Sequence, residues 1–177
     1  MGMKPFYKSG ENLRGSGYDY QQSRPPRDWQ KQSQSPPQNS LDEAINKINS
    51  LHNMSELDPK DFADTEGIAA RVAKEIRGMK TSQLRKFFDP LLKIEDELKK
   101  GGWSEQMEAR LYMVIPTLAY AVGRDLAPKQ FYKLIDVCIK KIITKEAVPN
   151  QKEKNFKRFM EFLRAIIAYN KYFFGGD

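Results

Sequence analysis

One short stretch of the chain combines the start of a helix with a cluster of positive charge. Its sequence is Lys80-Thr81-Ser82-Gln83-Leu84-Arg85-Lys86-Phe87-Phe88. Thr81 is a favourable N-cap residue, because its hydroxyl can accept a hydrogen bond from an early backbone N–H of the helix. Free N–H groups and the helix dipole also favour anions at this position. The stretch therefore predicts an anion-binding site, and in so basic a chain the expected anion is phosphate.

The rest of the sequence gives little support for catalysis. No histidine and cysteine cluster has the spacing of a zinc site, and Gly101-Gly102 is typical of a helix end rather than a phosphate-binding loop. The only histidine, His52, lies near the end of a predicted helix. The only cysteine, Cys138, lies in an apolar run and has no partner that would activate it. We therefore expect no enzyme activity, no metal site and no cofactor.

Positive charge is concentrated in the C-terminal part of the chain. The 177 residues have a net charge of +7, but residues 41–70 carry −5 and residues 71–177 carry +9. A body this basic is typical of proteins that bind a polyanion. A solvated helical exterior rich in lysine would have the same composition, so charge alone leaves both interpretations open.

Several cations along the predicted helices are candidate contacts to a phosphate backbone. On the last helix, Lys157, Arg164 and Lys171 recur every seven residues and form one stripe. A basic groove across such helices would bind phosphates without reading base sequence. The alternative is that some of these side chains pair with carboxylates such as Asp89 or Glu153. The candidates are Lys80, Arg85, Lys86, Arg124, Lys129, Lys133, Lys157, Arg158 and Arg164.

Apolar residues recur at the helical period from Leu41 onward and predict an all-α bundle of five to six helices over residues 41–177. Ser40 is the expected N-cap of the first helix. Pro90 predicts a kink or a split in the third helix, and Pro116 predicts an interruption of the fourth. The expected helices cover residues 41–51, 60–77, 81–100, 104–122, 127–144 and 150–174.

Residues 1–40 have a different composition. They include 21 Pro, Gly, Ser or Gln residues and almost no aliphatic ones, so they cannot bury enough apolar surface to offset their ordering entropy. We expect this segment to be disordered. Its aromatic residues are interleaved with arginines and could stack on exposed bases. A plain linker would also explain the composition.

Targeting signals are not evident in the sequence. No apolar run is long enough to span a membrane, and the N-terminus has no apolar signal core. The single cysteine fits a reducing compartment. We therefore expect a cytoplasmic protein without a membrane partner.

Three segments resemble the small helical subunit of the type III-A CRISPR effector complexes, the Csm complexes. Residues 80–88 are similar to the family's Thr-Ser-Gln-Ile-Arg-like helix start. Residues 118–124, Leu-Ala-Tyr-Ala-Val-Gly-Arg, resemble its Leu-Ala-Tyr-x-x-Gly-Arg element. Residues 159–172 resemble its C-terminal Phe-x-x-Phe-x-x-Ala-Ile-x-Ala-Tyr-x-Lys helix. The order and spacing of the three segments also agree with the family.

This resemblance implies a non-catalytic, all-α subunit that packs in several copies beside the backbone subunits. It implies guide RNA and target RNA as partners, together with the backbone and large subunits and copies of the same chain. By position, Lys80 and Arg85 match the basic helix start of the family and Arg124 matches its Gly-Arg element. Arg164 departs from the family, which often has an acidic residue there. The alternative function is a structural adaptor that binds proteins through exposed aromatic side chains.

Overall fold

The structure is a computed structural model that describes residues 39–175. The tail expected to be disordered, residues 1–40, lies outside this range except for its last two residues. Within the described range every regular element is helical, which confirms the expected all-α fold. The elements are α1 (Ser40–Ser50), η2 (Met54–Glu56), α2 (Pro59–Ala63), α3 (Ile68–Glu75), α4 (Thr81–Gly101), α5 (Glu105–Tyr112), α6 (Val114–Gly123), α7 (Lys129–Ile142) and α8 (Pro149–Phe174).

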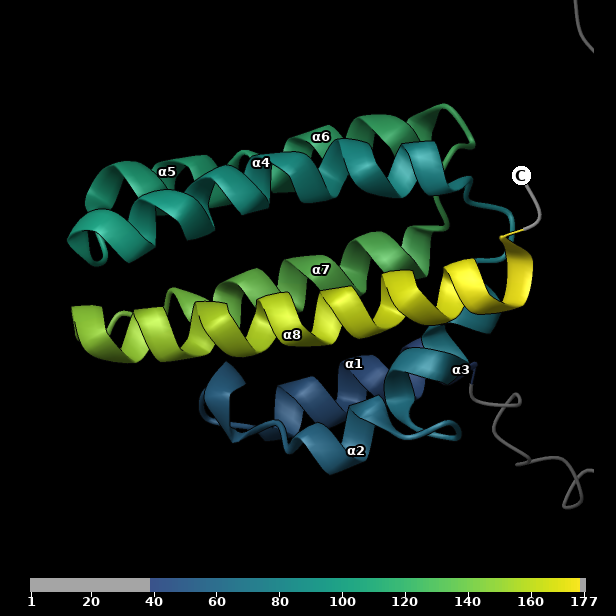
Figure 1. Cartoon of the computed structure of the whole chain (residues 1–177), viewed down its shortest axis with the longest axis horizontal. Helices are drawn as coiled ribbons and strands as arrows, with labels where there is room; N and C mark the ends of the chain where they lie inside the picture. Colours follow the sequence, from purple (N-terminus) through teal and green to yellow (C-terminus); the bar gives the residue numbers. More distant parts are fainter. Residues whose placement is uncertain (1–38, 176–177) are drawn as a thin grey trace, which may run out of the picture. The chain divides into compact units, whose positions relative to one another are not determined.

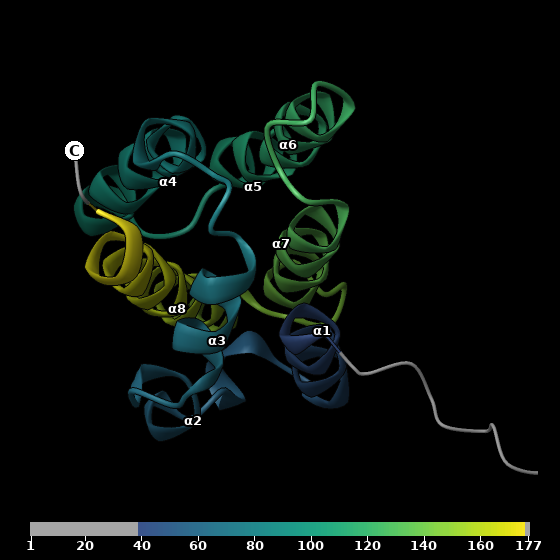
Figure 2. The same cartoon turned by 90° about the vertical axis from the view of Figure 1, so that its right-hand side faces the viewer.

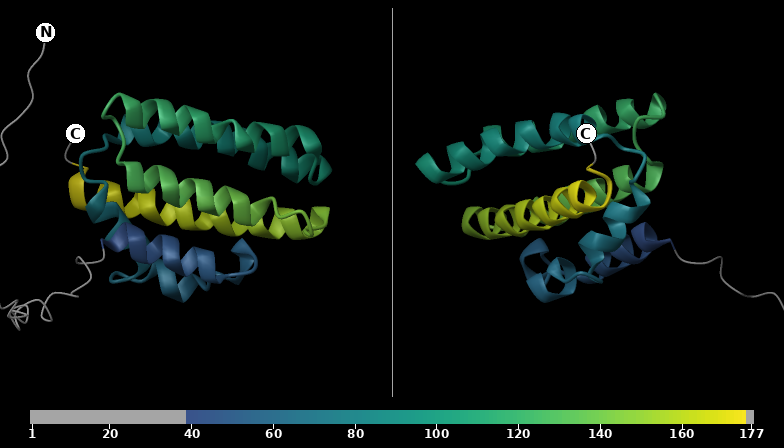
Figure 3. Two further views of the ribbon diagram at one scale, coloured as in Figure 1. Left: turned by 180° about the vertical axis from the view of Figure 1, so that it is seen from behind. Right: turned by 45° about the vertical axis from the view of Figure 1, so that its right-hand side comes forward.

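The helices are arranged in three layers (Figures 1 and 3). Helices α7 and α8 lie side by side in the middle layer. Helices α4, α5 and α6 cover one side of this pair, and α1, α2 and α3 cover the other. Because α8 has neighbours on both sides, its apolar residues extend beyond a single stripe, as a buried helix requires.

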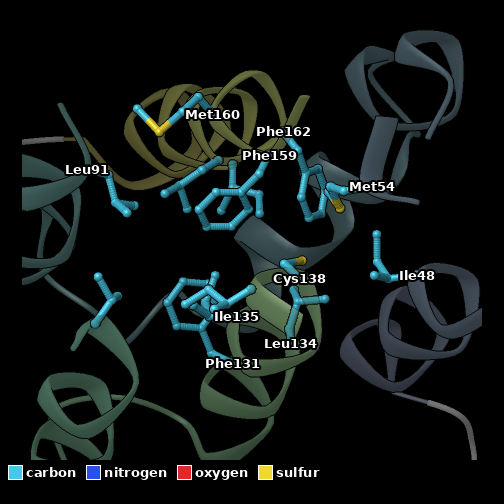
Figure 4. Packing of buried hydrophobic residues seen from close by; sticks show 14 of the residues in the cluster. Ile48, Met54, Leu91, Phe131, Leu134, Ile135, Cys138, Phe159, Met160 and Phe162 are labelled. Carbon is cyan, nitrogen blue, oxygen red and sulfur yellow. The ribbon is translucent and has the colours of Figure 1, made fainter. Parts of the chain in front are cut away.

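The core is built around the phenylalanines of α7 and α8. Phe131, Phe156, Phe159 and Phe162 are all at most 1% exposed. Phe131 and Phe159 lie between the two middle helices, while Leu91 reaches the core from α4 on one side (Figure 4). Each aromatic side chain of this kind buries roughly 150–250 Å² on folding, so these four are among the largest single contributors to the apolar core.

Two helices have their N-cap one residue earlier than the sequence predicts. Asn39, not Ser40, is the N-cap of α1, because its Oδ1 accepts the N–H of Leu41 at 2.9 Å. Lys80, not Thr81, precedes the first helical residue of α4. The cause is Gln83, whose Oε1 accepts the N–H of Lys80 at 2.8 Å.

Two of the six expected helices are each divided into two. Residues 64–67 separate α2 from α3, because the Asp64 carboxylate accepts the N–H of Glu66 at 3.0 Å and turns the chain. A Cβ at Gly67 would lie 2.8 Å from the carbonyl oxygen of Phe62, so this turn requires glycine. Met113 separates α5 from α6, and this break is the interruption that Pro116 predicted.

Helix α4 behaves differently at its proline. It is a single element from Thr81 to Gly101 with Pro90 inside it, so the expected split does not occur. Proline has no N–H, and the carbonyl of Lys86 therefore lacks the donor it would normally have four residues later. Pro90 is exposed, which lets that carbonyl remain solvated.

A buried amide joins three elements at the start of α8. Asn155 is 0% exposed, and its Oδ1 accepts the N–H of Ser55 at 3.1 Å and the side chain of Gln151 at 3.0 Å. Its Nδ2 donates to the carbonyl of Lys141 at 3.2 Å. The amide thus ties α8 to the 3-10 turn and to the end of α7. A buried polar group must be satisfied in this way, because an unmade bond costs about 1–3 kcal/mol.

Replacing this amide tests the junction. We expect Asn155→Leu to lower the free energy of unfolding by about 2–4 kcal/mol, because the backbone groups of Ser55 and Lys141 lose their partners. Asn150→Leu, an exposed change in the first turn of the same helix, is the control and should alter it by at most about 0.5 kcal/mol. Urea denaturation measures both, and equal effects would contradict the role of Asn155.

The single thiol offers a second test of the core. Cys138 is 0% exposed, and burial raises the pKa of its thiol well above the usual range, so the reactive thiolate is suppressed. We expect a disulfide reagent such as DTNB to modify Cys138 only as the protein unfolds. Ser82→Cys places a second thiol on the exposed side of α4 and should react at once in the folded protein. Rapid labelling of both thiols would show that α7 is not packed as described.

Candidate nucleic-acid interface

The nine candidate cations divide into two groups by their ion pairs. The three on α8 are paired with carboxylates. Lys157 Nζ lies 2.6 Å from Glu153 Oε1. Arg158 Nη1 lies 3.3 Å from Glu161 Oε2, without hydrogen-bond geometry. Ion pairs near the protein surface contribute only about 0–1 kcal/mol each, yet they lower the positive charge available to a ligand.

Arg164, the third of these, bridges two helices. Its Nη2 lies 2.6 Å from Glu95 Oε2 on α4, and its guanidinium carbon is 5.9 Å from the centre of the Phe88 ring. The side chain thus spans the contact between α8 and α4 on the surface of the bundle. The position of Arg164 indicates a role in helix packing. Its contact with Glu95 accounts for a cation at a position that is often acidic in the family the chain resembles.

The other six candidates have no ion pair with any residue in the described range, and all six are exposed. Arg124 is held differently, because its guanidinium lies over the Tyr120 ring at 5.6 Å and donates to the Tyr120 hydroxyl at 3.3 Å. These six side chains keep their full charge toward solvent. They are Lys80, Arg85, Lys86, Arg124, Lys129 and Lys133.

Three of the six are brought to one end of the bundle. Figures 1 and 2 show that α4 starts, α6 ends and α7 starts at the same end. Lys80 directly precedes α4, Arg124 directly follows α6, and Lys129 is the first residue of α7. A hollow of about 380 Å³ there is lined both by the turn before α4 and by Lys129. We call Lys80, Arg124 and Lys129 the basic end.

Helix dipoles add to the charge of the basic end. Helices α4 and α7 both present their N-termini there, and neither N-cap residue, Lys80 or Pro128, has a side chain that accepts a helical N–H. Each N-terminus carries a partial positive charge of about half a unit. Two groups oppose this potential: the C-terminus of α6, which carries a partial negative charge, and the carboxylate of Asp125 in the loop between Arg124 and α7.

The remaining candidates lie elsewhere. Lys133 is one turn beyond Lys129 on α7, whereas Lys86 lines a separate groove between α4 and the α5–α6 junction. Helix α8 begins at the opposite end of the bundle, so Lys157 and Arg158, in its N-terminal half, lie away from the basic end (Figure 1). The nine residues therefore do not gather at one place.

The sequence interpretation overlooked three further cations. Arg77 is exposed in the turn before Lys80 and has no ion pair in the described part of the chain. Lys93 and Arg110 line the same groove as Lys86. The seven-residue spacing of Lys86 and Lys93 was a usable signal, because it places both on one side of α4.

Two other kinds of site were also sought in residues 39–175. No helix there is long and apolar enough to cross a membrane. The same residues contain no group of three or more histidine, cysteine or acidic side chains that could hold a metal ion.

Comparison with known proteins gives one match. The model of the family described as Csm2 Type III-A matches residues 58–176, from the N-cap of α2 to the end of α8 and just beyond. This range includes all three segments that resemble the family. Neither the comparison with curated proteins nor that with solved structures gave a match. The chain therefore belongs to the Csm2 family, the small subunit of the type III-A CRISPR Csm complex, which acts with the other Csm subunits and RNA.

Proposed function

We propose that this subunit binds the phosphate backbone of guide and target RNA without base specificity, and that several copies pack along the Csm complex. The observation that carries the proposal is the basic end, where Lys80, Arg124 and Lys129 meet two helix N-termini. Arg85, Lys86 and Lys133 extend this unpaired charge along α4 and α7. The three cations of α8 contribute less, because RNA would have to compete with their carboxylate partners.

The chemistry of these groups favours backbone contact over sequence reading. Lysine, arginine and helix N-termini are the usual partners of phosphate oxygens. Sequence is read instead by hydrogen bonds to base edges, which need side chains fixed in bidentate geometry. Lys80 and Lys129 are exposed and extended from helix ends, so they suit a phosphate of any nucleotide.

The distribution of charge also supports packing of copies. Residues 41–70, which include α1, η2 and α2, have a net charge of −5, whereas the rest of the bundle is strongly basic. RNA would avoid the acidic layer, which leaves that layer available to a basic surface of another subunit or another copy. Complementary charges of this kind set orientation and register in protein interfaces.

The triple variant Lys80→Ala, Arg124→Ala, Lys129→Ala tests the basic end. We expect weaker binding of target RNA by the assembled complex, because each cation removed from a phosphate should reduce the slope of log K against log[salt] by about 0.7. Removing all three cations should therefore reduce the slope by about 2. Titration with labelled RNA at several salt concentrations measures this slope.

The matched control removes the same charge from α8, by Lys157→Ala, Arg158→Ala and Arg164→Ala. We expect a smaller change in the slope, because these cations are already paired. A larger change for the α8 triple than for the basic-end triple would show that RNA binds along α8 and not at the basic end. A flat salt response of the unmodified complex would refute backbone binding altogether.

The end of α8 favours a second candidate function, a structural adaptor. Tyr172 is 80% exposed and Phe174 is 42% exposed. By contrast, the neighbouring Tyr169 and Phe173 are half-buried, and their rings stack on each other. Phe173 lies under the Lys74 ammonium at 5.0 Å, and the Tyr169 hydroxyl donates to the carbonyl of Ala63 at 2.7 Å. Tyr172 and Phe174 are two residues apart on a helix and so point to different sides of it, but an exposed aromatic side chain is the kind of residue that anchors a protein partner.

We expect Tyr172→Ala with Phe174→Ala to weaken association with a neighbouring Csm subunit if this end is an adaptor surface. A buried aromatic anchor is worth about 2 kcal/mol or more, which is roughly 30-fold in Kd. Tyr112→Ala, which removes an exposed tyrosine from α5, is the control. Unchanged copurification of the double variant with the other subunits would exclude the adaptor function at this surface.

A further inference from the structure

A groove of about 240 Å³ lies between α4 and the junction of α5 with α6. Its walls come from two separate segments, residues 86–93 and 110–117, so no single sequence motif describes it. We call it the amphipathic groove, because its floor is apolar and its rim is basic. It lies away from the basic end and was not part of the sequence-based expectations.

The floor of the groove is formed by Phe87, Pro90, Met113 and Val114. Phe87 and Val114 pack against the core, which holds this floor in place. Met113 is 63% exposed, because the break between α5 and α6 turns it outward. A methionine thioether is polarisable and makes favourable contacts with aromatic rings. The floor therefore suits a flat, aromatic ligand.

The rim of the groove is cationic. Lys86 and Lys93 are seven residues apart on α4, which places them about two turns, or ~10.5 Å, from each other along one side. Neither has an ion pair among residues 39–175. Across from them, Arg110 Nη1 donates to Glu97 Oε1 at 2.7 Å, and this bond fixes the plane of its guanidinium.

Apolar and cationic side chains therefore meet in one place. The groove combines an apolar floor with two separated cations on its rim.

A nucleotide in a strand has the complementary groups, since it carries a flat base with an apolar face and an anionic phosphate on either side. We propose that the amphipathic groove holds one unstacked base of a bound RNA strand, with the flanking phosphates at Lys86 and Lys93. This proposal rests on the RNA-backbone function proposed above and adds a base contact to it. The base would be held mainly by its face, so the contact needs no particular base.

The size of the groove favours a base over a peptide. At about 240 Å³ it is smaller than the roughly 300–1,000 Å³ of pockets for drug-sized ligands. A helical peptide needs a longer groove with several anchor positions, at spacings of three, four and seven residues. A single planar ring needs only one.

The test uses the full chain and two single-stranded RNAs of equal length and charge, one normal and one with abasic sites. Base stacking on a protein is worth a factor of about 5–150 in affinity. We expect the unmodified protein to bind the abasic RNA at least 5-fold more weakly, with the same dependence on salt. Met113→Ala should reduce this difference, while Lys86→Ala with Lys93→Ala should weaken both RNAs and flatten the salt dependence.

The control is Val148→Ala, because Val148 has the same exposed fraction as Met113, 63%, but does not line the groove. It should leave the preference for normal RNA intact. In the assembled complex, RNA containing 4-thiouridine should cross-link under ultraviolet light to the peptide that contains Met113, as read by mass spectrometry.

The outcomes separate the two proposals. Equal, salt-dependent binding of both RNAs with no cross-link at Met113 would overturn the base site and leave backbone binding intact. Binding of neither RNA, with no cross-link, would overturn both proposals. If Met113→Ala leaves RNA binding unchanged but blocks another Csm subunit, the groove is a protein-docking surface and its assignment to RNA is wrong.

Discussion

Helix α8 must be apolar on two sides, because it lies between two layers of helices. Most features of the bundle depend on this constraint. Phe156, Phe159 and Phe162 are fully buried along α8, and Phe159 lies between α8 and α7 (Figure 4). The one polar group buried near the start of the helix, Asn155, is satisfied by partners from two other elements. A helix enclosed in this way cannot move without breaking both interfaces.

The same constraint divides the cations. Because both sides of α8 are covered, its charged residues are confined to the narrow exposed edges of the helix. Carboxylates lie close enough there to form ion pairs with them. Arg164 illustrates this, because Glu95 lies 69 residues away in sequence but 2.6 Å away in space. Helix ends are different, since they project beyond the packed layers. Lys80 and Lys129 are exposed at such helix ends without an ion pair in the described range, and their charge is therefore available to a ligand.

The sequence predicted the helices well and their ends less well. The six expected helices are all present, because a period of 3.6 in apolar residues is a signal repeated over many turns. The errors came from single side chains. Gln83 moves the N-cap of α4 from Thr81 to Lys80, and Asp64 divides one expected helix into α2 and α3, because one hydrogen bond decides whether a chain turns or continues. Pro116 coincides with a break and Pro90 does not, although the two prolines look alike in sequence.

For the candidate site, the sequence alone determined the helices, the excess of positive charge and the identity of the cations. The three short segments also pointed to the family, because they are local motifs. Only the tertiary structure decided which cations are paired and which lie together. Lys80, Arg124 and Lys129 share one end because α4, α6 and α7 alternate in direction. The groove beside Met113 likewise exists only once α4 packs against the α5–α6 junction. Helices form through interactions between residues that are close in sequence, so the sequence predicts them. The basic end and the groove depend instead on how whole layers of helices pack.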